Sequence, residues 1–212
     1  MDQPLRASAR LLHRGRDLLR RRGVFGLAAR VVQRPLHRVS GFELDLVMAG
    51  PIGSVRQHLD ARKAKLPAGT TCRCVTDRAE FPALRIAVDR LNPGNTFHFP
   101  DGEFRVAVAE RNRDLLAYWG FLRQGATLEG SGLFVHPDWR GRRLPAHLLA
   151  AVLSAGCDGI RTVSDWTDLF NRASIRAMRR CGLSPAGVIL QLACPGLGCR
   201  RWSFPLRAGM GT

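Results

Sequence analysis

The chain has 212 residues, of which 33 are lysine or arginine and 17 are aspartate or glutamate, giving a formal charge of +16. A hydrophobic share of 45% with 24% charged residues is ordinary for a folded domain, and it excludes disordered, collagen-like and disulfide-scaffold chains. No apolar run of about 18 residues occurs, which excludes a polytopic membrane protein. The excess of positive charge indicates either an anionic partner or a basic surface that is simply solvated.

The chain begins with a strongly basic segment. Residues 1–40 contain ten arginines and two acidic residues, and apolar residues such as Leu5, Ala9, Leu12 and Leu19 recur at helical spacing. This pattern predicts a helical N-terminal arm over 1–40, followed by a domain over 41–212. The arm either binds a membrane surface or a partner, or packs on the domain with its arginine stems covering apolar surface.

The first half of the domain combines a strand with two helices. Alternating residues predict a strand near 42–46 that is ended by Pro51. Helices are predicted near 54–65, with Ser54 as N-cap, and near 80–90. Two prolines and two glycines mark 92–102 as a loop.

The second half is richer in strands. A hairpin is predicted from strands near 104–108 and 115–122 around a polar turn at 110–114. The remaining elements, in chain order, are a strand at 127–135, a helix at 144–154, a strand at 160–166, a helix at 172–181 and a strand pair at 188–193 and 200–206. This order predicts an α+β fold with a βαβ unit at its centre.

The six cysteines, at positions 72, 74, 157, 181, 194 and 199, do not follow zinc-binding spacings. No histidine stands in register with them, so no metal site is expected. The N-terminus also lacks the apolar core of a signal peptide. We therefore expect free thiols and a cytoplasmic location.

The most informative segment joins the strand at 127–135 to the helix at 144–154. The strand ends at Val135, Pro137 breaks it, and an arginine- and glycine-rich turn follows. Free N–H groups at a helix start, together with the helix dipole, attract anions. Arg140, Arg142 and Arg143 add guanidinium groups that suit phosphate oxygens. The turn therefore predicts an anion site.

This turn resembles the acyl-CoA-binding motif of the GNAT N-acyltransferase family, V-x-P-x-x-R-G-x-G-x-G/A before a helix with paired leucines. The matching residues are Val135, Pro137, Arg140, Gly141, Leu144, Leu148 and Leu149. A second segment, from Asn171 to Leu183, is similar to the family's N-x-x-A/S-I-R-x-Y-x-K-x-G-F helix. The resemblance implies a GNAT-like three-layer fold around a mixed, mostly antiparallel sheet.

The resemblance also implies how acetyl-CoA would be held. The expected contacts are the turn residues Arg140, Gly141, Arg142, Arg143 and Ala146 for the pyrophosphate, the strand residues Leu133, Phe134 and Val135 for the pantetheine arm, and Asn171 as a pantetheine contact or a helix cap. Arg143 and Pro145 stand where the family has small residues, and Pro145 has no N–H. Weaker or altered pyrophosphate binding is therefore expected.

Glu129 stands where family members often carry a catalytic base. Strict alternation would put it on one strand face with Ser131, Leu133 and Val135. The alternative is a strand-end carboxylate that is solvated or paired with arginine. The family's tyrosine acid falls on Met178, which cannot donate a proton, and Tyr118 either faces the cleft or packs as a strand aromatic.

The implied activity is direct transfer of an acetyl group from acetyl-CoA to the primary amine of an acceptor that the sequence does not identify. One alternative is a non-catalytic or regulatory GNAT-fold protein that binds acyl-CoA or a partner, as Met178 and Pro145 would allow. Another is a basic protein that binds a membrane surface or nucleic acid through residues 1–40. Nucleic acid is the less expected partner because no recognition motif for it occurs. The sequence does not define an oligomeric state.

Overall fold

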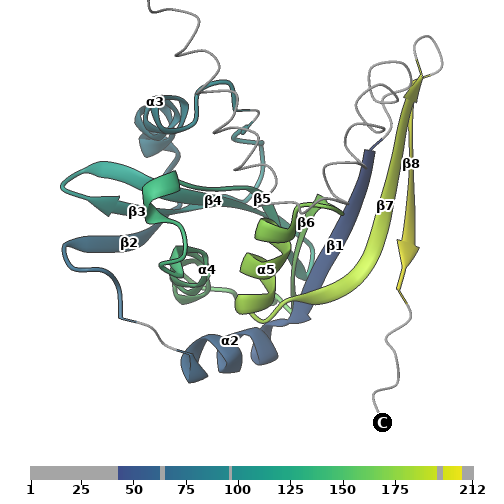
Figure 1. The fold of residues 1–212 in the computed structure, drawn as a ribbon, viewed down its shortest axis with the longest axis horizontal. Helices are drawn as coiled ribbons and strands as arrows, with labels where there is room; N and C mark the ends of the chain where they lie inside the picture. Colours follow the sequence, from purple (N-terminus) through teal and green to yellow (C-terminus); the bar gives the residue numbers. More distant parts are fainter. Residues whose placement is uncertain (1–42, 63–64, 96, 195–197, 207–212) are drawn as a thin grey trace, which may run out of the picture. The chain divides into compact units, whose positions relative to one another are not determined.

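The computed structural model describes residues 43–62, 65–95, 97–194 and 198–206 (Figure 1). The arm predicted over 1–40 lies outside these ranges. The described chain forms two compact units. The larger unit comprises Met48–Trp166 and Ala177–Ser184, and the smaller comprises the described residues of 43–47, 167–176 and 185–206.

The fold is built on a mixed, mostly antiparallel sheet. Its strands are β1 (Glu43–Pro51), β2 (Thr70–Val75), β3 (Phe104–Arg111), β4 (Asp114–Gln124), β5 (Thr127–Val135), β6 (Thr162–Asp168), β7 (Ser184–Cys194) and β8 (Gly198–Pro205). Hydrogen bonding orders them β2-β3-β4-β5-β6-β1-β7-β8. Strands β2 to β5 are antiparallel neighbours, whereas β5 and β6 run parallel. The predicted α+β fold with a central βαβ unit is confirmed.

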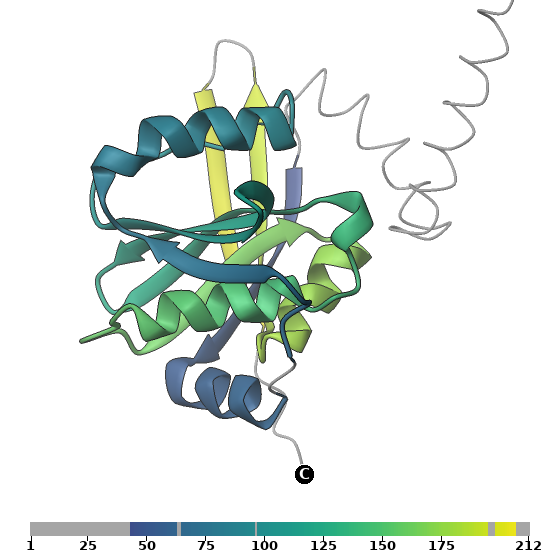
Figure 2. The ribbon, with the colours of Figure 1, turned by 90° about the vertical axis from the view of Figure 1, so that its left-hand side faces the viewer.

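The helices are α2 (Ile52–Ala61), α3 (Phe81–Leu91), α4 (Leu144–Ser154) and α5 (Arg172–Arg180). In the larger unit, α3 and α4 cover opposite faces of the sheet, which gives this unit three layers (Figures 1 and 2). Helix α4 is the crossover between the parallel strands β5 and β6. None of the described helices is both long and apolar enough to cross a membrane.

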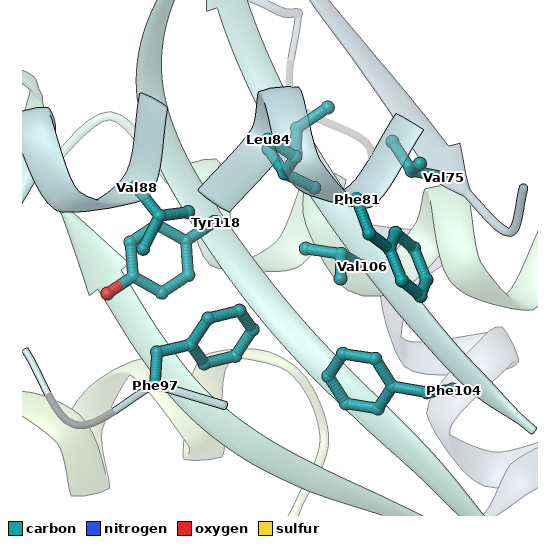
Figure 3. Packing of buried hydrophobic residues seen from close by; sticks show 9 residues of the cluster. Val75, Phe81, Leu84, Val88, Phe97, Phe104, Val106 and Tyr118 are labelled. Atoms are coloured by element: carbon teal, nitrogen blue, oxygen red, sulfur yellow. The ribbon is translucent and has the colours of Figure 1, made fainter. Parts of the chain in front are cut away.

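An aromatic core fills the space between α3 and the sheet (Figure 3). Phe81, Leu84 and Val88 recur along one face of α3, as an amphipathic helix requires. Phe97, from the loop after α3, packs with its ring centroid 4.9 Å from that of Tyr118. The Tyr118 hydroxyl accepts a hydrogen bond from Asn92 (3.1 Å), and burial raises its pKa. Tyr118 is therefore a packed strand aromatic.

Two local predictions were wrong. Strand β2 was not predicted, because Thr70–Val75 alternates only weakly and its order depends on antiparallel pairing with β3. Helix α2 begins at Ile52, with Pro51 as its N-cap and no side-chain cap. Ser54 therefore lies inside the helix, because the fixed φ of Pro51 (−59°) already directs the chain into the first turn.

The smaller unit carries the β7–β8 hairpin, which pairs from Gly187↔Pro205 to Cys194↔Gly198. Gln191 of β7 donates hydrogen bonds to two carboxylates of β1, those of Glu43 (3.3 Å) and Asp45 (3.4 Å). Burial, reinforced by the charge of Glu43, raises the pKa of Asp45. The amide of Gln191 thus offsets part of the repulsion between two acidic groups.

Candidate active site

The turn that leaves β5 is closed by its own hydrogen bonds. His136 N–H donates to the Leu116 carbonyl (2.8 Å), which ties the end of β5 to β4. A 3₁₀ turn over Pro137–Trp139 follows, in which the Arg140 N–H donates to the Pro137 carbonyl (3.2 Å). The Arg140 side chain then reaches back, and its Nε donates to the Val135 carbonyl (3.2 Å). Arg140 therefore stabilises the turn with both its backbone and its side chain.

The start of α4 leaves N–H groups unused. Gly141 (φ +81°) and Arg143 (φ +60°) are left-handed, and Arg143 is the N-cap residue of α4. Within the described residues, the N–H groups of Gly141, Arg142 and Arg143 donate to no protein acceptor. Ala146 N–H instead donates to the Arg143 carbonyl (3.0 Å). The turn thus has free N–H groups at three consecutive residues, 141 to 143. The N–H groups of Arg140 and Ala146 donate to carbonyl groups of the same segment.

Two guanidinium groups lie on the indole of Trp139. The Arg142 Cζ is 4.6 Å from the ring centroid, and the Cζ of Arg111, at the end of β3, is 5.5 Å from it. Both distances are within cation–π range. The turn thus combines the positive charge of Arg142 with free backbone donors.

Strands β5 and β6 pair over a short stretch. Their register runs from Thr127↔Thr162 to Glu129↔Ser164 and then ends. Among the described residues, the part of β5 from Gly130 to Val135 has no partner on β6. Apart from the Val135 carbonyl, which accepts the hydrogen bond from Arg140 Nε, the backbone N–H and C=O groups on that edge are available to a ligand. The three predicted strand contacts, Leu133, Phe134 and Val135, all lie in this stretch.

A β-bulge interrupts the alternation of β5. Tyr118 pairs with Phe134 and Gly120 pairs with Ser131, so Gly132 and Leu133 both stand opposite Trp119. Gly132 has φ +69°, a conformation that favours glycine.

The bulge changes which residues of β5 lie on the same face of the strand as Glu129. Leu122, which pairs with Glu129, lies on the face of β4 that also carries Gly120 and Tyr118, the partners of Ser131 and Phe134. Glu129 therefore shares its face with Ser131 and Phe134. The prediction that it shares a face with Leu133 and Val135 was wrong, because the extra residue of the bulge reverses the later positions.

Side chains press on β5 from both faces at its glycines. A Cβ built on Gly132 would lie 2.5 Å from Cδ2 of Phe97, and one on Gly130 would lie 2.6 Å from Cγ of Asp165. Neither glycine can accept a side chain without displacing a buried neighbour. The backbone path of β5 is thus fixed by Phe97 on one face and Asp165 on the other.

Sequence reasoning missed Asp165. Its carboxylate is 3% exposed and accepts hydrogen bonds from Trp119 Nε1 (2.9 Å) and from the Trp166 N–H (2.7 Å). Burial, together with the charge of Glu129, raises the pKa of Asp165 to about 7, although both hydrogen bonds lower it. The available signal was an acidic residue at a core-facing position of a strand.

Two residues of the second sequence motif, the segment from Asn171 to Leu183, have structural roles: one caps a helix and the other packs in the core. Asn171, in the smaller unit, accepts a hydrogen bond from the Ser174 N–H (3.3 Å) through Oδ1 and so caps the start of α5. Met178, in the larger unit, is 1% exposed and belongs to the core. Met178 therefore has a packing role and supplies no proton.

A protein-family comparison decides the affiliation of this chain. Residues 75–183, just over half of its length, match the model of the acetyltransferase (GNAT) family. The chain is a member of the GNAT family. The matched GNAT segment contains the pair β5 and β6, the turn at 136–143 and helix α4.

Solved structures share this GNAT fold at low sequence identity. A functionally unknown conserved protein from Staphylococcus epidermidis superposes with a TM-score of 0.51 at 12% identity, covering 74% of this chain and 64% of that one. A protein assigned to the GNAT family from Novosphingobium aromaticivorans gives 0.51 at 18% identity, covering 71% and 63%.

A GCN5-related N-acetyltransferase-like protein from Streptococcus suis gives a TM-score of 0.50 at 12% identity, covering 84% of this chain and 67% of that one. This chain spans less than two thirds of the first two structures. At these identities the likeness extends to the fold alone. No curated protein sequence matched the chain.

Proposed function

We propose that this GNAT protein transfers an acetyl group from acetyl-CoA to the primary amine of an acceptor. The observation that carries the proposal is the separation of β5 from β6 beside a turn with three free N–H groups. A strand edge with unused hydrogen-bonding groups suits an extended amide-containing chain, and the turn suits its phosphates.

The proposed binding mode follows the free groups. The N–H groups of Gly141, Arg142 and Arg143 would hold the pyrophosphate, with the Arg142 guanidinium beside them. Arg140 would act through the turn that it stabilises, and Ala146 through its place in the first turn of α4. Leu133, Phe134 and Val135 would offer backbone groups to the pantetheine arm.

The proposed chemistry assigns the proton of the amine to Glu129. A protonated amine cannot attack, so the Glu129 carboxylate takes a proton from it, directly or through water. The amine nitrogen then bonds to the thioester carbonyl carbon, the carbon–sulfur bond breaks, and the thiolate leaves with the electron pair. The new amide nitrogen gives up its second proton to solvent. Since Met178 and Tyr118 are buried, solvent returns the proton to the thiolate.

The direct test measures acetyl-CoA binding by calorimetry and CoA release over a panel of primary amines. Binding together with amine-dependent release supports an acetyltransferase. Binding without release from any amine would instead favour a regulatory GNAT protein. A chain that does not bind acetyl-CoA would refute both.

Replacing Glu129 with glutamine should lower kcat by about 100-fold or more, because positioned general bases contribute on that order. The change keeps the size of the side chain and removes only its basicity. Turnover is measured between about pH 6 and pH 9 with the best amine of the panel. Glu110→Gln is the matched control, since Glu110 pairs with Arg73 on the surface of β3. Wild-type turnover of the Glu129 variant across this range would contradict its role as base.

Replacing Gly141 with valine should weaken acetyl-CoA binding by about tenfold or more. Valine is strained at φ +81°, so the turn would rotate its N–H groups away from the ligand. Gly94→Val is the matched control, because Gly94 has φ +74° and, like Gly141, no neighbour within 4 Å of its Cβ position. Both variants should lose similar stability, and only the Gly141 variant should lose affinity. Equal affinities would contradict a role of this turn in binding.

A further inference from the structure

Asp165, in the larger unit, lies where β6 separates from β5. Ser164 is the last residue of β6 that pairs with β5, and Asp165 follows it. Its carboxylate is buried against Gly130, whose Cβ position is 2.7 Å from Asp165 Oδ2. The same oxygen accepts the indole N–H of Trp119, a fully buried residue of β4.

The Asp165 carboxylate therefore links β6 to β4 by a hydrogen bond, and it contacts β5, which lies between these strands, at Gly130. Gly130 allows this because it has no Cβ to block the path. Trp119 is also the residue opposite the bulge formed by Gly132 and Leu133. One hydrogen-bonded link thus joins the point where β5 and β6 separate to the point where β5 bulges.

Burying a carboxylate in a core costs free energy of folding, since the carboxylate loses its hydration. Two N–H donors, from Trp119 and Trp166, offset part of that loss. Apolar packing would fill the same space but would not fix the direction of the indole or the spacing of the strands. This combination favours a role in geometry over a role in stability.

We infer that Asp165 is a positioning residue, whose link to Trp119 beside Gly130 sets the opening between β5 and β6 into which the pantetheine arm of acetyl-CoA enters. The inference rests on the proposed function. Asp165 does not touch the reacting atoms in this role; it acts through the β5 backbone from Gly130 to Leu133.

The link is sensitive to ionisation. Among the residues that the structure describes, the ionisable groups coupled to Asp165 are Glu129 from β5, whose charge acts on Asp165, and Cys181, on which Asp165 acts. The charge of Glu129 opposes ionisation of Asp165, and burial raises the pKa of the Cys181 thiol to about 12, so that thiol stays protonated. Since burial raises the pKa of Asp165 to about 7, the ionisation of this carboxyl changes near neutral pH.

The first experiment observes the link without any ligand. The indole N–H resonance of Trp119 is identified by its loss in Trp119→Phe. It should move with pH, with a midpoint near 7, in the wild type and should stay constant in Asp165→Asn. Amide exchange in Gly130–Val135 should be faster in Trp119→Phe and in Asp165→Leu, which has no acceptor for the indole. Unchanged exchange in these two variants would overturn the inference.

The second experiment connects the link to the ligand. Asp165→Leu and Trp119→Phe should each raise the Kd for acetyl-CoA by about tenfold, and the double variant should be no weaker than the weaker single variant, since both remove one link. Val88→Ala, on the buried face of α3, is the control for general destabilisation and should keep the wild-type Kd.

The two proposals fail in different ways. If the wild type binds acetyl-CoA and both Asp165→Leu and Trp119→Phe bind it equally well, the positioning role is wrong and the proposed function stands. If the wild type does not bind acetyl-CoA, the proposed function fails and the positioning role fails with it. Additive losses in the double variant would also overturn a shared link.

Discussion

Replacing Gly130 with alanine should lower the free energy of unfolding by about 3 kcal/mol. The new methyl group would lie 2.6 Å from Cγ and 2.7 Å from Oδ2 of Asp165. Overpacking of a core typically costs about 1–3 kcal/mol, and a carboxylate pushed away from Trp119 also leaves a buried donor unsatisfied. Asp165 cannot simply swing aside, because hydrogen bonds from Trp119 and Trp166 hold both of its oxygens.

Urea unfolding of Gly130→Ala beside Gly53→Ala tests this expectation. Gly53 lies in the exposed part of α2, with no atom within 4 Å of its Cβ position. Alanine there should stabilise the protein by about 0.5–1 kcal/mol, because glycine is a poor helix former. The same chemical change should thus have opposite signs at the two positions. A Gly130→Ala protein as stable as the wild type would show that Asp165 does not confine β5.

The second large effect is a loss of stability with rising pH. Burial raises the pKa of Asp165 from 3.8 to about 7, so between these values the native state keeps a proton that the unfolded chain releases. The resulting stabilisation is complete below about pH 4 and is lost as pH rises through about 7. Between pH 5 and pH 8 this group alone should lower the unfolding free energy by about 2.5 kcal/mol.

The measurement is the difference between the wild type and Asp165→Asn in urea unfolding at several pH values from 5 to 8. Other groups with raised pKa values, such as Asp45, contribute equally to both proteins and cancel. The wild type should lose stability relative to the variant as pH rises. Parallel curves for the two proteins would mean that Asp165 does not carry a raised pKa.

The sequence predicted elements best where a clear local signal, such as a proline or an apolar repeat, marked their ends. The strand at 127–135 and the helix at 144–154 have the predicted bounds, since Pro137 and the apolar repeat of α4 mark them clearly. Strand β2 had no such signal. Its threonines and cysteines form a strand because β3 is beside them, and that pairing brings together residues more than 30 positions apart, such as Thr70 and Arg111.

The same division holds for the candidate site. The turn at Gly141 could be predicted because its residues are consecutive. The face of Glu129 could not, because a single extra residue at the bulge reverses the alternation, and Gly132 alone signals it. Asp165 depends on contacts with β4 and β5, which no local pattern describes.

The stacking of Arg142 on Trp139 makes the indole an intrinsic optical reporter. A guanidinium 4.6 Å from the ring centroid exerts a strong electric field on the indole, to which its emission energy responds. An anion that draws Arg142 from the ring would alter that field, so occupancy of the turn would be visible as a change of emission colour. Screening of unlabelled phosphorylated compounds then requires only a fluorimeter, with Trp139→Phe as the blank.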